Sequence, residues 1–427
     1  MLVRHVLSSL NIYWIGNSKQ LLLLPVNNLQ SNSKVSIPLK LKEVKLPCWA
    51  NDCGVNGKIL VPRECINLCS EEVDWQKVDW WSAIFLLMEG WHERIWEKTH
   101  GVIHSYSFKL KDWDTRAWDH AWVNRIALFL RKWFLFHFDK RKSFFEELPK
   151  SNFILSHDVD AVSKTLPIRL KQTVFNLFNA LRFLSIGSVT NSIKKCGQSF
   201  RMLFGNENWW VFEKLLEMEK ELEIKAVYNF YADGRPKNLK RWLMDPSYDI
   251  SSDRLKSLLA KLKSGGHEVG LHPTFDAWSD SKLLNDQKLL LEESLGSMVT
   301  SCRQHWLRFS WSKTWKAQSR AGIERDSTLM FNDRPGFRNS AALSWNPWDP
   351  ETSKIHVMKS VNSLIMDSHL YDYQSFSSKE RSDQIKRWTN ECRSVHGECS
   401  LLWHPHTLTN DYGWEQGFKI LLQSSSL

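Results

Sequence analysis

The stretch "ILSHDVDA", residues 154–161, sets Asp158 and Asp160 at the end of an apolar run. The run predicts a buried strand. A strand gains no stability from acids at its end, and two carboxylates this close make each other harder to ionise. We therefore expect the two carboxylates to belong to a site that the strand carries.

Strands and helices alternate from residue 153 onward. This alternation predicts a parallel sheet or a (β/α) barrel, in which functional residues lie at the carboxyl ends of strands. Asp158, His272, Arg303 and His404 all occupy such ends. The apolar strand candidates are FILSH (153–157), KAVYNFYA (225–232), HEVGLH (267–272), SMVTSCRQHW (297–306), IERDSTLMF (323–331), NSLIMD (362–367) and ECSLLWH (398–404).

The length of 427 residues predicts two domains. The charged run at 139–152 indicates a boundary near residue 148, between an N-terminal α/β domain (1–148) and a second domain (149–427). In the first domain, QLLLLPV (20–26) and KVSIPLKL (34–41) are typical of short strands. The stretches 79–96 and 122–138 have the apolar period of helices.

A basic helical insertion is predicted at about 162–206. Residues 161–206 contain seven Lys or Arg and no Asp or Glu. Within them LKQTVFNLFNALRFL (170–184) is amphipathic, which suits the surface of an anionic membrane. The alternative is an ordinary helix that caps the barrel, with a solvated basic face. The net charge of +10 also permits nucleic acid, but no recognition motif accompanies it.

The first residues do not read as a signal peptide, because Asn11, Asn17 and Lys19 interrupt the apolar run. No segment has the length of uninterrupted apolar residues that a spanning helix needs. We expect a cytoplasmic protein, peripheral at the inner face of the membrane if the insertion binds it. The four clustered cysteines, Cys48, Cys53, Cys65 and Cys69, lack zinc-knuckle spacing and are expected to be free thiols.

A second informative stretch is GGHEVGLHPTFDAW, residues 265–278. Because side chains alternate along a strand, His272 ends on one face while His267 points to the other. Asp276 reaches the side of His272 if a helical turn begins there. An imidazole and carboxylates from separate strand ends are suitable ligands for Zn²⁺ or a similar divalent ion.

Five motifs occur in order: SHDVDA, GHEVGLHP, RQHWLRF, GFRNS and LLWHPH. Together, over residues 150–410, they resemble the polysaccharide deacetylase family (NodB homology, carbohydrate esterase family four). The match is best to a branch with a separate N-terminal domain, associated with surface-polysaccharide synthesis. The resemblance implies a distorted (β/α) barrel and a metal-dependent removal of acetyl from a sugar amine.

The resemblance also implies residue roles. Asp158 corresponds to the catalytic base and Asp160 to a metal ligand, although the D-x-D spacing leaves these two exchangeable. His272 corresponds to the second ligand, Arg303 to the arginine that holds the base, and His404 to the general acid. Arg338 matches a substrate-side arginine, and we consider Trp306 and Trp403 as walls of a sugar pocket. These last three are equally typical of salt-bridge or core residues.

One position departs from the family pattern: a second histidine is common four residues after the first, and Asp276 stands there. Either Asp276 replaces it, or His406 or His305 comes from a neighbouring loop, or the metal is weakly held and the protein is inactive. The functional hypotheses are accordingly three. The first is a metal-dependent deacetylase that hydrolyses an N-acetyl (or O-acetyl) group on a cell-surface glycan or its precursor; the second is a non-catalytic glycan-binding or membrane-peripheral assembly protein. The third is a hydrolase of a small-molecule C–N bond.

Overall fold

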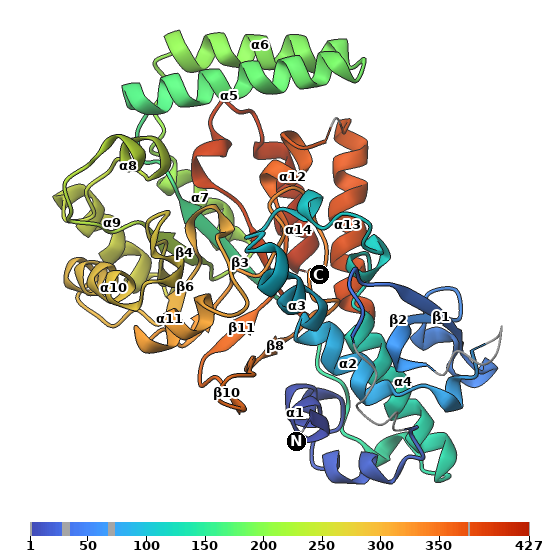
Figure 1. The fold of residues 1–427 in the computed structure, drawn as a ribbon. Coiled ribbons are helices and arrows are strands. Elements are labelled where there is room, and N and C mark those ends of the chain that lie inside the picture. The colour runs from blue at the N-terminus through green and yellow to red at the C-terminus, as the bar shows by residue number, and fades with distance from the viewer. Residues whose placement is uncertain (1, 28–34, 67–72, 375, 427) are drawn as a thin grey trace.

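A nine-stranded sheet forms the centre of the molecule. The computed structural model describes residues 2–27, 35–66, 73–374 and 376–426 (Figure 1). The strands follow the order β12–β13–β3–β4–β5–β6–β7–β11–β8, and all neighbours are parallel except β8, which runs antiparallel to β11. The strands are β3 Asn152–Val159, β4 Val227–Phe230, β5 Glu268–Leu271, β6 Ser301–Cys302, β7 Arg325–Asp326, β8 Ser344–Trp345, β11 Lys359–Val361, β12 Ser363–Met366 and β13 Glu398–Leu402.

The predicted α/β class with a curled, mostly parallel sheet is confirmed. Each of the seven predicted strand segments contains a strand. The strands between residues 344 and 361 were not predicted, because each has only two or three residues and shows no apolar run. Among them, β9 (Trp348–Asp349) and β10 (Lys354–Ile355) form a separate two-stranded ladder.

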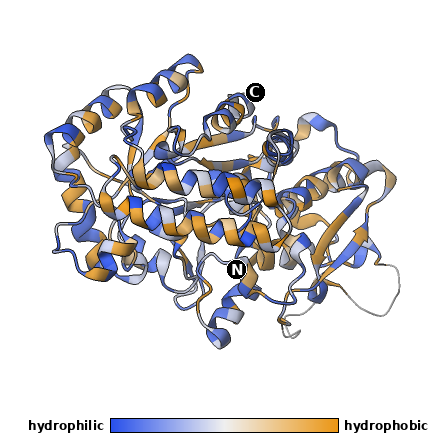
Figure 2. Cartoon of the chain, turned by 90° about the horizontal axis from the view of Figure 1, so that it is seen from above, coloured by the Kyte–Doolittle hydropathy of each residue, from blue (hydrophilic) through white to orange (hydrophobic). Residues whose placement is uncertain are grey.

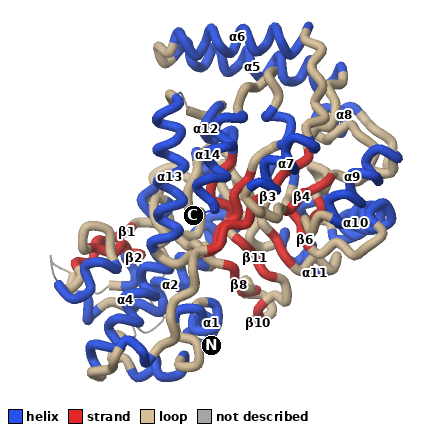
Figure 3. Tube along the Cα trace, turned by 180° about the vertical axis from the view of Figure 1, so that it is seen from behind, coloured by secondary structure: helices blue, strands red, loops and turns tan. Residues whose placement is uncertain are grey.

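Helices surround the sheet, as Figure 3 shows from behind. Most are ordinary amphipathic helices: α9 buries Leu255, Leu258, Leu259 and Leu262 and exposes its lysines. Such a helix gains its stability by packing its apolar face on the sheet. The helices of this part are α7 Phe212–Glu221, α8 Leu239–Met244, α9 Asp253–Ser264, α10 Ser281–Leu295, α11 Thr314–Arg320, α12 Asp367–Tyr371, α13 Ser378–Ser394 and α14 Glu415–Ser426.

The predicted insertion is a pair of antiparallel helices, α5 (Leu166–Ser185) and α6 (Val189–Phe204). We call this pair the hairpin. It lies along one end of the molecule, above the carboxyl end of β3 (Figure 1). Among the described residues, no helix is both long and apolar enough to cross a membrane.

The N-terminal part contains α1 (Leu2–Ser9), α2 (Trp80–Met88), α3 (Trp91–His100) and α4 (Trp122–His137), with an antiparallel pair β1 (Leu41–Lys45) and β2 (Lys58–Pro62). Two predictions here are wrong. Residues 18–23 of the leucine run form a 3₁₀ helix, and the strand expected at 34–41 begins only at Leu41. The stretch 79–96 is divided into two helices at Gly90, whose φ is 55° and where a Cβ would meet the ring of Trp311.

The hydrophobic core of the N-terminal part is shared with the second part of the chain, whereas most of the sheet packs in a separate cluster. The N-terminal aromatic cluster continues into Phe309, Trp311, Trp315 and Trp345 of the second part. The Arg125 side chain of α4 binds Glu391 of α13, with the Nη2–Oε2 distance at 2.6 Å. The boundary near residue 148 stays a prediction, and the shared core indicates that the two parts are not independent in their packing.

Candidate metal centre and active site

A pocket of about 530 Å³ opens at the carboxyl ends of the strands. Its polar side, which we call the floor, consists of Asp158, Asp160, His272, His305 and His404. Its apolar side, which we call the wall, comprises Val174, Phe175 and Phe178 of α5 and Trp242 and Leu243 of α8. The structure therefore brings together Asp158, Asp160, His272 and His404 as predicted.

Asp158 is buried, and its carboxylate is held from two sides. Arg303 Nη1 lies 3.3 Å from Asp158 Oδ1, and Asn229 Nδ2 donates to the same oxygen at 2.8 Å. Asn229 is the register partner of Asp158 on β4. The next strand presents Gly270, where a Cβ would lie 2.4 Å from Asn229 Oδ1. The glycine therefore leaves the space in which Asn229 reaches Asp158.

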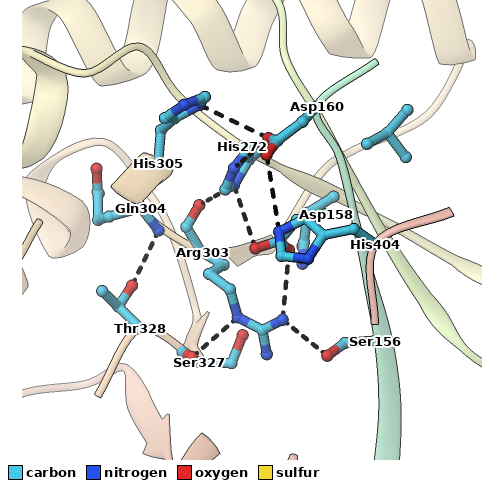
Figure 4. Close-up of polar contacts among 12 residues, drawn as sticks. Ser156, Asp158, Asp160, His272, Arg303, Gln304, His305, Ser327, Thr328 and His404 are labelled. Atoms are coloured by element: carbon cyan, nitrogen blue, oxygen red, sulfur yellow. Dashed lines mark hydrogen bonds and ion pairs between the residues drawn. The ribbon is translucent and has the colours of Figure 1, made fainter. Parts of the chain in front are cut away.

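Arg303 is fully buried, and all three of its nitrogens donate hydrogen bonds (Figure 4). Nε donates to the Ser327 carbonyl at 3.1 Å, and Nη1 donates to Ser156 Oγ at 2.8 Å. Nη2 donates to Ser363 Oγ at 3.0 Å and to Ser400 Oγ at 2.7 Å. A buried guanidinium with its donors satisfied is both tolerated and immobilised. It keeps an opposite charge beside Asp158 in a fixed direction.

Asp160, His272 and His305 form a group of three possible metal ligands. One ligand atom from each lies within 4.8 Å of the others. His272 Nε2 is 3.2 Å from Asp160 Oδ1, and His305 Nδ1 is 3.9 Å from the same oxygen. Asp160 Oδ1 and His305 Nδ1 are buried and have no hydrogen-bond partner. Buried polar atoms are normally satisfied, so two orphaned atoms facing one point fit a cation between them.

The donor set has the chemistry of a divalent site. Two imidazoles and one carboxylate suit Zn²⁺ or another first-row ion, and leave positions open for water and substrate. His272 Nδ1 lies 2.7 Å from the carbonyl oxygen of Arg303. Because a carbonyl only accepts, Nδ1 carries the proton and Nε2 presents its lone pair to the group. This outer hydrogen bond is typical of metal-binding histidines.

Electrostatics agree with ligation for Asp160 and His305. Burial opposes ionisation of Asp160, but the imidazoles of His305, His272 and His404 outweigh it and hold the pKa of Asp160 well below its ordinary value. Burial lowers the pKa of His305 well below its ordinary value. Asp160 is therefore an anion and His305 a neutral imidazole, which are the protonation states that ligation requires. For His272, burial opposes protonation, but the carboxylates of Asp158 and Asp160 outweigh it and raise the pKa of this imidazole above its ordinary value.

His305 reaches the floor through an unusual backbone. Strand β6 ends at Cys302, and residues 305–307 form a 3₁₀ turn. Trp306 and Leu307 have φ values of 57° and 48°, in the left-handed region that non-glycine residues rarely occupy. Strain of this kind concentrates at functional sites. The turn directs both His305 and Trp306 into the pocket, where each lines its surface.

His404 lies on the opposite side of Asp160 and is paired with Asp367, the first residue of α12. His404 Nδ1 is 2.9 Å from Asp367 Oδ1, and the His404 backbone N–H donates to Asp367 Oδ2 at 2.9 Å. The other ring nitrogen, Nε2, lies 3.7 Å from Asp160 Oδ2. Burial opposes protonation, but the charge and hydrogen bond of Asp367 outweigh it and raise the pKa of His404 to about 10.

Three residues predicted for the site lie elsewhere. Asp276 is 46% exposed in its side chain and binds Lys240 Nζ at 2.7 Å, because the chain turns away after Pro273; His305 lies in the group instead. Trp403 is buried in the core against Tyr371 and Phe418. Arg338 is buried and paired with Glu93 of α3. Trp306 lines the pocket as expected, and its Nε1 donates to the Met244 carbonyl at 3.1 Å.

His406 also lines the pocket, but it stacks on Trp209 with ring centroids 5.5 Å apart and does not join the three ligands. Sequence reasoning missed Asn229 and Asp367. Asp367 carried a signal, since it too is an acid at the end of an apolar strand. Asn229 carried none, because its role depends on strand register. Cys48, Cys53 and Cys65 are free thiols, and Cys69 lies outside the described residues.

The comparison with solved structures returns matches of low sequence identity. A Mycobacterium smegmatis protein named as a polysaccharide deacetylase matches with a TM-score of 0.38 and 15% identity, over 66% of this chain and 86% of that one. Puue allantoinase matches with a TM-score of 0.37 and 10% identity, over 64% and 82%. A CE4 family pseudoenzyme from Bacillus anthracis matches with a TM-score of 0.26 and 12% identity, over 64% and 62%.

No family model matches the sequence, and the curated proteins contain no significant match. Identities this low say nothing about substrate or activity. The site itself defines the class of protein: a curled α/β sheet with a candidate Asp-His-His metal group at the carboxyl ends of its strands.

Proposed function

We propose that the protein is a metal-dependent hydrolase that removes an N-acetyl group from a sugar of a cell-surface glycan or its precursor. One observation carries the proposal. The three candidate ligands lie between two further pairs, Asp158–Arg303 on one side and His404–Asp367 on the other. A base and an acid that flank a metal group are what amide hydrolysis requires. Four of the five sequence motifs that resemble the deacetylase family contain the three candidate ligands together with Asp158, Arg303 and His404, whereas Asp367 lies outside the motifs.

Asp160, His272 and His305 would hold the ion, and their donor set favours Zn²⁺. A bound divalent ion supplies Lewis acidity, which polarises an acyl carbonyl and lowers the pKa of water. Asp158 accepts the proton of the attacking water. Arg303 keeps that carboxylate ionised by its positive charge and fixes its direction.

His404 donates a proton to the departing amine. Its Nδ1 is fixed by Asp367, so that Nε2 faces the pocket beside Asp160. An amine leaves poorly unless it is protonated, whereas an alcohol needs this help less. The fixed His404–Asp367 pair therefore favours N-acetyl over O-acetyl as the group removed. The third hypothesis, a small-molecule C–N bond, uses the same residues and is an outcome of the substrate test.

The test is acetate release from chitooligosaccharides and from nucleotide-linked N-acetyl sugars, with zinc added. We expect Asp158→Asn and His404→Ala each to reduce the rate at least about a hundredfold, the usual contribution of a general base or acid. Asp276→Asn is the matched control, since it changes an acid of the loop after His272 that lies outside the floor. It should leave the rate unchanged.

Elemental analysis tests the metal group separately. The wild type should hold one divalent ion per chain, and Asp160→Ala should lose it while keeping its fold by circular dichroism. A wild type without stoichiometric metal, and without acetate release from any of these substrates, would contradict the hydrolase and favour a non-catalytic glycan-binding protein.

A further inference from the structure

The hairpin exposes large apolar side chains along its whole length. On α5 these include Leu170, Val174, Leu177, Leu181 and Leu184, and on α6 Val189, Ile193, Phe200 and Phe204. We call these nine residues the outer face. Figure 2 looks down onto the hairpin, and hydrophobic residues recur along both helices. Apolar patches on this scale mark a surface that binds something.

The side chains that the hairpin buries, between its two helices or against the rest of the protein, are mostly polar. Asn176 and Asn179 of α5 are buried, as are Ser192, Lys195, Gln198 and Ser199 of α6, with Ala180, Phe183 and Met202 as the apolar exceptions. The side-chain nitrogens Asn176 Nδ2, Asn179 Nδ2 and Gln198 Nε2 are buried and have no hydrogen-bond partner. Helices that meet through small and polar side chains and turn their apolar residues outward are typical of lipid surroundings.

The charge of this segment fits the same surroundings. Residues 161–206 contain no acid. Lys194 and Arg201 are exposed. Lys164 pairs with Asp411 at 2.7 Å and Lys195 with Asp372 at 2.5 Å, and these two ion pairs attach the hairpin to the rest of the protein. Neither helix is apolar all round, and neither qualifies as a spanning helix. A one-sided apolar surface with exposed cations therefore suits the plane of an anionic bilayer.

The outer face is continuous with the pocket. Val174 belongs to both the outer face and the wall, and Trp242 and Leu243 of α8 extend the apolar rim on the other side of the opening. Lys171 also lines the pocket, with its Nζ 5.2 Å from the Trp306 ring centroid. The cavity thus passes from the polar floor, past one cation, to an apolar mouth. Its shape fits an amphiphile with a sugar at one end and a lipid at the other.

We propose that the outer face inserts into the interface of an anionic lipid bilayer, and that the pocket there receives a sugar attached to a lipid through an anionic linkage. The docking depends only on the hairpin, whereas the substrate class rests on the proposed hydrolase. Binding at the bilayer places the pocket mouth against the lipid surface, so that the headgroup enters the floor while the chain stays among apolar side chains.

Co-sedimentation of the full chain with vesicles tests the docking. We expect the wild type to bind vesicles of equal parts phosphatidylcholine and phosphatidylglycerol, and to bind pure phosphatidylcholine more weakly. The double variant Leu181→Glu/Phe200→Glu changes one side chain on each helix, 67% and 66% exposed, outside the pocket. Its partition constant should fall by about a hundredfold, because two large inserted side chains become charged.

The matched control is Leu289→Glu/Val357→Glu, which charges two exposed apolar residues elsewhere on the molecule and should bind like the wild type. A wild type that ignores both vesicles, or a hairpin double variant that binds as well as the wild type, overturns the docking. Sedimentation velocity tests the alternative that a second copy of the chain covers the outer face. If the wild type is a dimer that the hairpin variant dissociates, and neither binds vesicles, the outer face joins two copies and the proposal is wrong.

The substrate class has its own readouts. Metal-free Asp160→Ala should bind N-acetylglucosamine linked through phosphate to a dodecyl chain at least about tenfold more tightly than free N-acetylglucosamine, measured by tryptophan fluorescence. Adding Phe175→Ser to Asp160→Ala should remove that difference, and Phe175→Ser alone should keep the metal content of the wild type. Equal binding of the two sugars contradicts the lipid-linked substrate. Preferential binding together with no acetate release would contradict the hydrolase alone, and vesicle binding by Asp160→Ala keeps the docking independent of both.

Discussion

Hydrogen bonds to neighbouring strands fix the floor of the pocket, whereas the wall stands on a hairpin whose buried amides lack partners. Arg303 contacts three serines, a backbone carbonyl and Asp158. By contrast, Asn176 and Asn179 leave their amide nitrogens unsatisfied. The floor is therefore held in fixed positions, as catalysis needs, whereas the hairpin is the part for which we propose a lipid surface.

The largest effect is expected at Arg303, which holds the floor residue Asp158. Arg303→Met leaves the Asp158 carboxylate buried without its cation, so we expect the free energy of unfolding to fall by about 3–5 kcal/mol. Lys171→Met, beside the wall on α5, removes a cation that has no carboxylate within ion-pair distance among the described residues, and should cost less than about 1 kcal/mol. Urea denaturation measures both. Equal losses would break the distinction between floor and wall.

Two buried ion pairs allow a second comparison, one pair in the main part of the protein and one in the hairpin. Glu391 of α13 accepts hydrogen bonds from Arg125 and lies 2.9 Å from His120 Nδ1 as an ion pair. Burial opposes its ionisation, but these partners outweigh burial and lower the pKa of Glu391 from 4.5 to about 2. Because the folded pKa is depressed, the stabilisation is present above pH 4.5 and is lost as pH falls towards 2. Glu391→Gln should cost about 3 kcal/mol at pH 7 and progressively less below pH 4.5.

Lys195–Asp372 is the corresponding ion pair of the hairpin. Lys195→Met should loosen the hairpin with little effect on global unfolding, which hydrogen exchange of α6 will detect. A Glu391→Gln loss that stays constant between pH 7 and pH 3 would contradict the assigned pKa.

The ligand set gives a smaller, more specific effect. His305→Ala should weaken zinc binding by about a hundredfold, since it removes one of three protein ligands. Asp276→Ala should leave zinc binding unchanged, because that carboxylate pairs with Lys240 at the surface. Competition with a fluorescent chelator measures both. The reverse result would restore Asp276 as the ligand and exclude His305.

The smallest expected effect is at Leu181, which we compare with a leucine on another helix. Leu258 of α9 is buried on the sheet, and Leu258→Ala should cost about 2–5 kcal/mol. Leu181 of α5 faces outward, and Leu181→Ala should change stability by no more than about 0.5 kcal/mol in water. Thermal unfolding without lipid compares the two. A large loss at Leu181 would mean that the outer face is covered by protein.

The sequence was sufficient for features that follow from local pattern. Apolar runs ending in polar residues predicted the strands that carry Asp158, His272 and His404. Prediction from the sequence failed where the path of a loop decides which way a side chain points. The strand predicted to reach Trp306 ends at Cys302, and the left-handed turn that brings His305 into the floor has no signature in a bulky residue. Asp276 was misplaced for the same reason, since the path after Pro273 depends on tertiary contacts.

Burial was the second point of failure. Arg338 and Trp403 are residue types common in sugar sites. In the structure, however, Arg338 pairs with Glu93, and Trp403 packs in the aromatic core. Likewise, the period of residues 170–184 predicted an amphipathic helix but not which side would face the protein. Periodicity identifies a helix, and only packing shows which side of it is covered.

The connection between β3 and β4 contains more chain than it needs. These strands are adjacent and parallel, and one helix suffices for such a crossover. α7 already provides it, directly before β4. The hairpin is therefore an appendage to a complete βαβ unit. If the hairpin docks as proposed, bilayer binding and the pocket floor can be separated: a shorter loop would abolish the binding and leave the floor in place, and the same helix pair grafted into another crossover would carry the binding to a different protein.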